Sequence, residues 1–225
     1  MIDLSNKFLF LHFRRTGGSM FTRGYHRQRK IANINYREAT FGTGAGGTKH
    51  SPYKSYFNNF ANHDISSFYK MIIVRNPWDL LVSDFWAWGY PPSQSALIEK
   101  SKRNSVKYLS EFLGGVYYRS FRKFLIKMSG AKRGTMGDMI SGCENDVKII
   151  KYENYDSEVS DVFNDLGMSS PYKRMNEKEL AEDYDLRYGG VRRRPIDYRE
   201  MYTDATKDLV YKLCKKDIKK FNYEF

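Results

Sequence analysis

Three short apolar runs set the expected secondary structure, at Lys7–Phe13, Phe68–Arg75 and Val147–Lys151. The first two are apolar at nearly every position, as in strands buried on both faces of a parallel sheet. We expect a helix after each run, over Met20–Ile31, Trp78–Trp86 and about Asp156–Leu166. Strands that alternate with helices predict an α/β domain whose central parallel sheet is flanked by helices.

Glycine and proline mark the ends of these units. Pro77 suits the first turn of the second helix, and Gly167 suits the end of the third. Thr40–Gly47, with four glycines, and Tyr90–Ser93, with two prolines, are expected to be loops. The sequence shows no internal repeat.

Further helices are expected in the second half of the chain. Ser105–Met128 fits two helices broken near Gly114, and Asp204–Phe221 fits a final helix. One face of that final helix collects Val210, Cys214, Ile218 and Phe221. The charged stretch Asn176–Arg194 fits either a helix or a loop.

Length and composition favour one domain over residues 1–225. With 225 residues and 41% hydrophobic side chains, the chain has enough apolar material for a core of that size. No apolar run approaches the roughly 20 residues of a membrane span, and the first residues lack the pattern of a secretory signal. We therefore expect a cytoplasmic protein. Two distant cysteines, Cys143 and Cys214, argue against a disulfide framework and a zinc site.

The formal net charge of +12 predicts an anionic partner. Nucleic acid, a nucleotide and an acidic polysaccharide all fit this charge, and ordinary solubilising charge is the alternative. The basic residues favour a folded basic surface over a disordered tail, because they fall in four separate stretches: Arg23–Lys30, Lys100–Lys107, Arg119–Arg133 and Arg192–Arg194.

The first expected strand is followed by a candidate phosphate loop. Thr16, Gly17, Gly18 and Ser19 lie between that strand and a helix, where backbone N–H groups and the helix dipole favour an anion. The glycines allow close approach, the Thr16 and Ser19 hydroxyls can donate, and Arg15 adds a charge-assisted contact. A plain tight turn is the alternative.

A second candidate anion site follows the second expected strand. Arg75 ends the strand at the edge where open α/β sheets bind ligands, and Ser83 lies two turns into the next helix. A surface hydroxyl would be the ordinary interpretation of Ser83 by itself. Together with Arg75, it predicts a pocket for a second phosphate.

The two segments resemble a known family. Phe10–Ser19 (FLHFRRTGGS) is similar to the 5′-phosphosulfate loop hxxPKTGGT of sulfotransferases that use 3′-phosphoadenosine-5′-phosphosulfate (PAPS). Arg75 through Ser83 resembles the family's 3′-phosphate motif RxPxxxxxS. The C-terminal region, Tyr198–Tyr202 and Asp217–Phe225, resembles carbohydrate sulfotransferases of the heparan-sulfate 2-O and related bacterial type. About Gln94–Asn145 remains uncovered, and we expect it to supply the acceptor pocket.

This resemblance implies a P-loop-like three-layer α/β domain that uses PAPS as the donor. The sulfuryl group is transferred to a hydroxyl of the acceptor, which we expect to be a carbohydrate, and PAP is the product. The resemblance implies no metal requirement. We also expect no membrane and no nucleic-acid partner. The implied 5′-phosphosulfate ligands are Arg14, Arg15, Thr16, Gly17, Gly18 and Ser19, and the 3′-phosphate ligands are Arg75 and Ser83. Where the family has Pro-Lys, this chain has Arg14-Arg15, so that Arg15 takes the place of a catalytic lysine. Arginine keeps the charge but differs in geometry and proton release.

His50 is the best candidate for the base that accepts the hydroxyl proton. It follows the glycine loop and precedes Ser51-Pro52, which suits the start of a helix. Lys49-His50-Ser51 also resembles a segment of carbohydrate sulfotransferases whose histidine is the proposed base. A solvent-facing loop histidine is the alternative. His12, inside the first strand, is expected in the core or behind the site.

Other residues were weaker candidates. Arg193, in the run before Pro195, is expected to contact the 3′-phosphate or to be part of a solvated charge run. Trp78 and Trp86 are expected in the core, and Trp88 is a candidate wall of the ligand site. Three rival functions remain open: a P-loop kinase, although GxxxxGK[ST] is absent, a basic nucleic-acid-binding protein, and a family member that binds PAP without catalysis.

Overall fold

The computed structural model describes residues 1–31, 39–40, 50–89, 120–131, 134–168 and 197–225. The chain divides into two compact units, which we describe one at a time. The first takes in the described parts of 1–76, 134–174 and 219–222, and the second those of 77–133, 175–218 and 223–225. The single domain expected over residues 1–225 stays a prediction.

The first unit is built on a five-stranded sheet of order β3-β1-β2-β4-β5. Its strands are β1 (Ile2–Asp3), β2 (Phe8–Leu11), β3 (Ala39–Thr40), β4 (Tyr69–Val74) and β5 (Val147–Lys151). β2, β4 and β5 are parallel, whereas β1 pairs antiparallel with both β2 and β3. The α/β prediction is therefore confirmed, with a parallel centre inside a mixed sheet.

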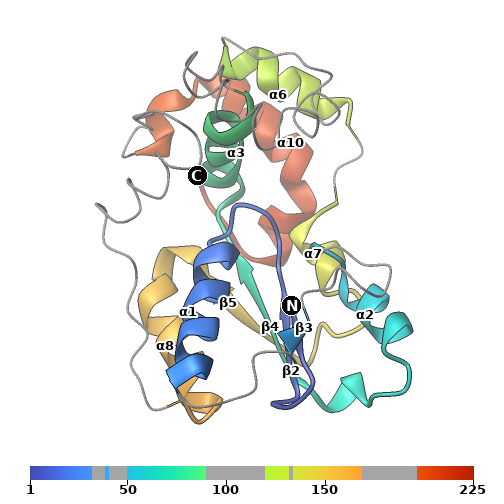
Figure 1. The fold of residues 1–225 in the computed structure, drawn as a ribbon. Coiled ribbons are helices and arrows are strands. Elements are labelled where there is room, and N and C mark those ends of the chain that lie inside the picture. The colour runs from blue at the N-terminus through green and yellow to red at the C-terminus, as the bar shows by residue number, and fades with distance from the viewer. Residues whose placement is uncertain (32–38, 41–49, 90–119, 132–133, 169–196) are drawn as a thin grey trace, which may run out of the picture. The chain divides into compact units, whose positions relative to one another are not determined.

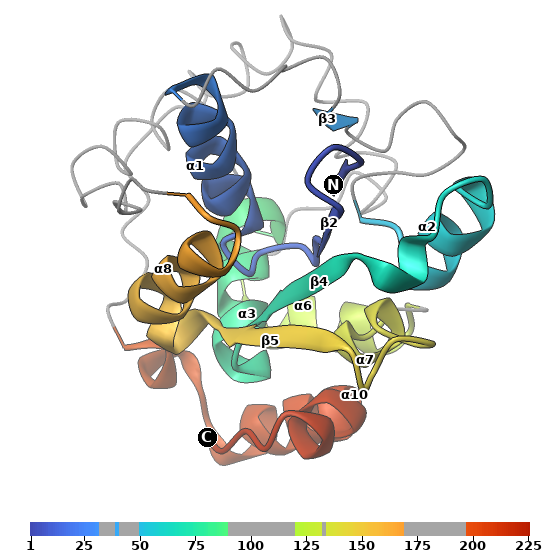
Figure 2. The same cartoon turned by 90° about the horizontal axis from the view of Figure 1, so that it is seen from below.

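Helices cover both sides of this sheet in Figures 1 and 2, with α1 and α8 on one side and α2 and α7 on the other. Their bounds are α1 (Gly18–Ile31), α2 (Tyr53–Asn59), α7 (Met136–Met139) and α8 (Tyr155–Asp165), with the short turns η2 (Ile65–Ser67) and η4 (Tyr152–Asn154). Alternate residues of the central strands pack against α1 and α8 in one core that includes Phe10, Phe21, Met71, Ile150 and Phe163. This packing fixes the loops at the strand ends.

The second unit is helical in its described part. It contains α3 (Pro77–Asp84), η3 (Phe85–Gly89), α6 (Phe121–Ser129), η5 (Tyr198–Met201) and most of α10 (Asp204–Lys220). Aromatic rings form much of its core: the Phe121 ring lies 5.1 Å from that of Tyr202, and the Phe225 ring lies 5.4 Å from Tyr202 and 5.6 Å from Trp78. The Tyr202 hydroxyl donates to the Trp78 carbonyl at 2.9 Å.

Most predicted elements are present where the structure describes them, with two corrections: Thr40, expected in a loop, pairs in β3, and the helix expected through Trp86 ends as α3 at Asp84 and continues as the π-helical turn η3. All three strands and the helices that follow them are present. Gly167 ends α8 as expected: its φ is +66°, its N–H donates to the Asn164 carbonyl, and Met168 N–H donates to the Phe163 carbonyl. The apolar face expected on the final helix is buried, although a kink at Cys214 interrupts α10.

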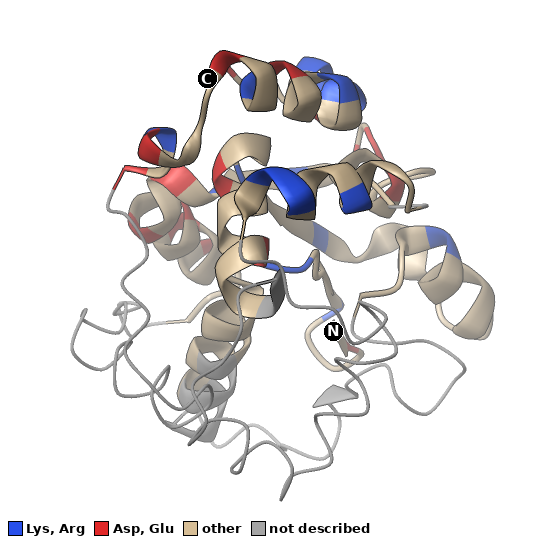
Figure 3. Cartoon of the chain, turned by 90° about the horizontal axis from the view of Figure 1, so that it is seen from above, with Lys and Arg blue, Asp and Glu red and all other residues tan. Residues whose placement is uncertain are grey.

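Several predictions fall wholly or partly outside the described residues. Thr40 is in β3, but the rest of the Thr40–Gly47 loop, Tyr90–Ser93, the break near Gly114 and Asn176–Arg194 lie outside. None of the described helices combines the length and the apolar composition of a membrane-spanning segment. Figure 3 shows the described Lys and Arg on several separate helices, α6 and α10 among them, and not in one element.

Candidate active site

The candidate phosphate loop connects β2 to α1. Thr16 is fully buried, and its Oγ1 donates to the Phe13 carbonyl at 2.9 Å. The hydroxyl therefore stabilises the turn itself, and donation to a ligand would require it to leave Phe13. Ser19, in the first turn of α1, is exposed. In any helix the first N–H groups precede the first i→i−4 bond, which makes a helix start suited to an anion.

Both glycines of the loop are required by their surroundings. Gly17 has a φ of +84°, and a Cβ at this position would lie 3.0 Å from the Tyr155 ring and 3.1 Å from the Tyr152 ring. A Cβ on Gly18 would lie 2.2 Å from Cδ2 of His12. The Gly17 carbonyl then accepts from the N–H groups of Met20 and Phe21, at 2.9 and 3.1 Å, and starts α1.

Arg15 lies in the left-handed region, with a φ of +63°. For a residue with a side chain this conformation costs about 1–2 kcal/mol, so the loop must be held by other contacts. One such contact comes from Arg75, whose Nη1 donates to the Arg15 carbonyl at 2.8 Å. Arg14 and Arg15 are both half-buried.

Arg75 follows β4 directly and is 4% exposed. Because β2 and β4 are parallel and paired in register from Phe8 and Tyr69 onward, the segments that leave their carboxyl ends lie side by side. The guanidinium stacks over the Tyr152 ring, 4.0 Å from its centroid. The structure thus brings the first candidate anion site into contact with the arginine of the second.

His50 also reaches this edge of the first unit. Its Nδ1 lies 2.8 Å from the His12 carbonyl oxygen, and the two imidazole rings are 4.8 Å apart. His50 is half-buried. α2 starts at Tyr53 with Pro52 as an extended N-cap that makes no side-chain cap bond. The helix expected after His50 is therefore present, but the side-chain cap is not.

The remaining predicted residues belong to the second unit or lie outside the described residues. Ser83 is on α3 in the second unit and is 4% exposed. Trp78 is buried as expected, and its Nε1 donates to the Lys207 carbonyl at 3.2 Å. Trp86 is half-buried. Arg193 and the Trp88 side chain lie outside the described residues.

Sequence reasoning missed the tyrosines at the end of β5. Tyr152 supports Arg75, and Tyr155 packs on Gly17, with its hydroxyl donating to the Gly17 carbonyl at 3.4 Å. Glu153, between them, accepts from the Asn76 N–H at 2.7 Å. A signal was present: Val147–Lys151 was predicted as a parallel strand, and residues after such a strand lie at the ligand-binding edge.

Metal ligation and thiol chemistry are two other ways in which a protein of this kind of fold could act. Within the described ranges, no three His, Cys, Asp or Glu side chains gather as metal ligands would. Burial raises the pKa of the Cys143 thiol to about 11, so it stays protonated near neutrality and is a poor nucleophile. The first unit brings together the start of α1, Arg15, Arg75 and His50. Such a set can hold an anion and accept a proton.

Comparison with known proteins agrees with this chemistry. The profile described as "Sulfotransferase family" matches residues 1–224. No curated protein matches the chain.

Proposed function

The chain belongs to the sulfotransferase family, whose members take the sulfuryl group from PAPS. We propose that the acceptor of this sulfuryl group is a carbohydrate hydroxyl. Sequence resemblance and charge support this acceptor class. Lys49-His50-Ser51 and the C-terminal region both resemble carbohydrate sulfotransferases, and the net charge of +12 suits an acidic polysaccharide.

The observation that carries the site assignment is the hydrogen bond from the Arg75 guanidinium to the Arg15 carbonyl. It joins the residue proposed for the 3′-phosphate to the loop proposed for the 5′-phosphosulfate. PAPS carries anionic groups at both of these positions. A nucleotide with a single phosphorylated end would leave one part of this arrangement without a ligand to bind.

We assign the roles by position. The N–H groups of Gly17–Ser19 and the Arg15 side chain stabilise the charge that grows on the leaving phosphate oxygen. Thr16 and Arg14 complete that loop. Arg75 binds the 3′-phosphate, together with Ser83 as the RxPxxxxxS motif implies and with Arg193, which is expected from a separate loop and lies outside the described residues. His50 accepts the proton of the attacking hydroxyl, and the rest of catalysis is orientation for in-line displacement at sulfur.

Nucleotide binding is tested by thermal stabilisation. A ligand that binds only the native state raises its stability, by about 2.7 kcal/mol at a hundred times its Kd. We expect PAP without metal to raise the Tm more than ADP, ATP or ATP with magnesium does. Preference for ATP with magnesium would favour the kinase rival. Stabilisation by RNA or DNA but not by PAP would favour the nucleic-acid-binding rival.

Transfer is tested by PAP release from PAPS in the presence of saccharides that differ in charge. The His50→Ala variant should keep its stabilisation by PAP and lose turnover by about a hundredfold or more, because general bases contribute at least that much. Stabilisation of the wild-type protein by PAP without transfer to any saccharide would overturn the proposed acceptor class. It would leave a PAP-binding protein or another acceptor.

A further inference from the structure

His12 joins the candidate base to the candidate phosphate loop. It follows β2 and is 5% exposed. Its ring stacks on Phe10, with centroids 5.3 Å apart and an interplanar angle of 16°. The His50 ring lies 4.8 Å from it and is tilted by 59°. The imidazole of His12 therefore contacts both a core ring and His50.

The same ring lies directly against the start of α1. A Cβ on Gly18 would be 2.2 Å from Cδ2 and 2.4 Å from Nε2 of His12. Real Cβ atoms do not approach that closely, so the position of the His12 ring depends on glycine at residue 18. Any movement of the loop relative to this ring would also change the support of His50.

The backbone carbonyl of His12 selects the tautomer of the neutral His50 ring. Nδ1 of His50 lies 2.8 Å from the His12 carbonyl oxygen. A carbonyl oxygen only accepts hydrogen bonds, so the hydrogen must be on Nδ1. In the neutral imidazole, Nε2 then carries the lone pair, because the bond made by one ring nitrogen sets the tautomer.

We propose that His12 is a positioning residue for sulfuryl transfer: its carbonyl holds His50 as the Nδ1–H tautomer, and its ring fixes the direction of Nε2 relative to the phosphate loop. This inference rests on the proposed function for the role of His50. The tautomer itself does not.

Nε2 of His50 accepts the proton of the acceptor hydroxyl while that oxygen forms a bond to sulfur. The bond between sulfur and the bridging phosphate oxygen breaks, and its electron pair stays on that oxygen, in PAP. His50 becomes a cation whose Nδ1–H still donates to the His12 carbonyl, an arrangement that stabilises the new charge.

The direct test is the tautomer of His50 in the wild-type chain, measured by two-bond ¹H–¹⁵N correlation of the imidazole rings above the ordinary histidine pKa of about 6.5. Signals of His50 are assigned by their loss in His50→Asn, whose amide keeps a donor where Nδ1 was. We expect hydrogen on Nδ1 and a lone pair on Nε2. Hydrogen on Nε2, or rapid exchange of both tautomers, would overturn the inference.

The role of the ring is tested by two substitutions of His12. His12→Ala removes the support of His50, and we expect kcat to fall by about tenfold or more, with the KM for PAPS and the stabilisation by PAP nearly unchanged. His12→Phe keeps an aromatic ring against Phe10 and His50 and should restore most of kcat. Equal kcat values for the two variants would contradict positioning by the ring.

The two proposals fail differently. An Nε2–H tautomer in an active sulfotransferase would remove the role of His12 and leave the function standing. A wild-type protein with the Nδ1–H tautomer but no transfer from PAPS would remove the function and leave the tautomer standing.

Discussion

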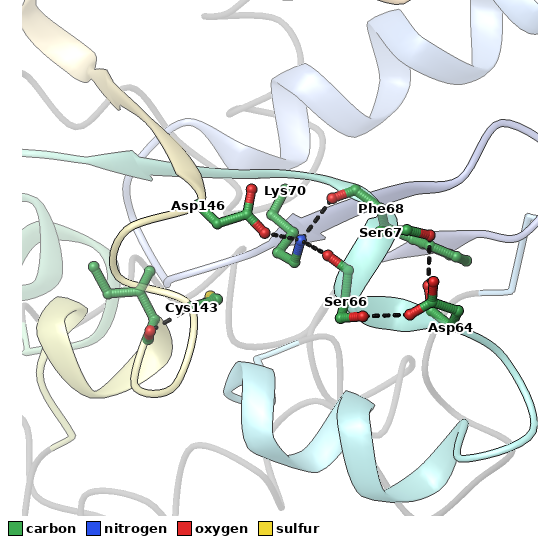
Figure 4. A network of polar contacts seen from close by, with 8 residues as sticks. Asp64, Ser66, Ser67, Phe68, Lys70, Cys143 and Asp146 are labelled. Carbon is green, nitrogen blue, oxygen red and sulfur yellow. Dashed lines mark hydrogen bonds and ion pairs between the residues drawn. The ribbon is translucent and has the colours of Figure 1, made fainter.

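Strand β4 has a basic residue near each end, and the two are used in opposite ways. Lys70, near the amino end, has a side chain that is 1% exposed. Its ammonium donates to the carbonyls of Ser66 and Phe68, at 2.6 and 2.7 Å, and to the Asp146 carboxylate (Figure 4). These three bonds use all three of its donors.

Arg75, at the carboxyl end, is equally buried but meets a different environment. Its partners there include the carbonyl of Arg15 and the face of Tyr152, next to the start of α1. Loops that leave the carboxyl ends of parallel strands lead to helix N-termini, which attract anions. Burial and charge are thus alike at the two ends. The two cations differ in place: Lys70 is at the amino end, whereas Arg75 both supports the Arg15 loop and lies at the edge where parallel sheets bind ligands.

The largest expected effect is on nucleotide binding by Arg75→Ala. Hydrogen bonds to charged groups contribute about 1.5–3 kcal/mol, so we expect PAP to bind about a hundredfold more weakly. Arg75→Lys keeps the charge but lacks the planar guanidinium, so its affinity for PAP should lie between those of Arg75→Ala and the wild type. Isothermal titration measures both. PAP affinity equal to wild type in Arg75→Ala would remove the distinction between the two ends.

Lys70→Met should lower the stability of the protein and leave its affinity for PAP unchanged. Two carbonyls lose their buried donor, and we expect the free energy of unfolding to fall by about 2 kcal/mol, measured by urea denaturation. PAP affinity should not change. Lys148→Met, at an exposed position of β5, is the matched control and should stay within about 0.5 kcal/mol of wild type. If Lys70→Met bound PAP more weakly at unchanged stability, Lys70 would be a ligand-binding residue and not a structural one.

The smallest expected effect is that of Tyr152→Leu. Loss of the ring face beneath Arg75 costs about 1 kcal/mol, which corresponds to about fivefold weaker PAP binding. Tyr152→Phe keeps the ring and should bind PAP nearly as the wild type does. If both variants lose the same affinity, the stacking contact is not what supports Arg75.

Sequence reasoning found the parts of the fold whose signal is local. The apolar runs predicted β2 and β4, which are almost wholly buried, and also β5, in which Ile150 is buried. Gly167 predicted the end of α8, because strand burial and a positive φ restrict residue type directly. β1 and β3 span two residues each, too short for any periodicity. Their pairing depends on neighbours far along the chain.

The candidate site was predictable to the extent that its residues form motifs. Arg75 and the Thr16–Ser19 loop carry recognisable spacing, and the contact of Arg75 with Arg15, next to that loop, follows from parallel pairing of the strands. The packing of Tyr152 against Gly17, and of His12 against Gly18, joins residues with no shared motif. Those contacts depend on three-dimensional packing and had to be read from the structure.

We propose that Arg75 recognises the 3′-phosphate of a nucleotide whose 5′ end lies on the Thr16–Ser19 loop. This recognition is tested most directly by a cycle of four affinities from isothermal titration, for PAP and AMP with the wild type and with Arg75→Ala. We predict that removing the 3′-phosphate weakens binding strongly in the wild type and little in the variant, with a coupling of about 2 kcal/mol. An equal loss in both proteins, and so a coupling near zero, would contradict the account.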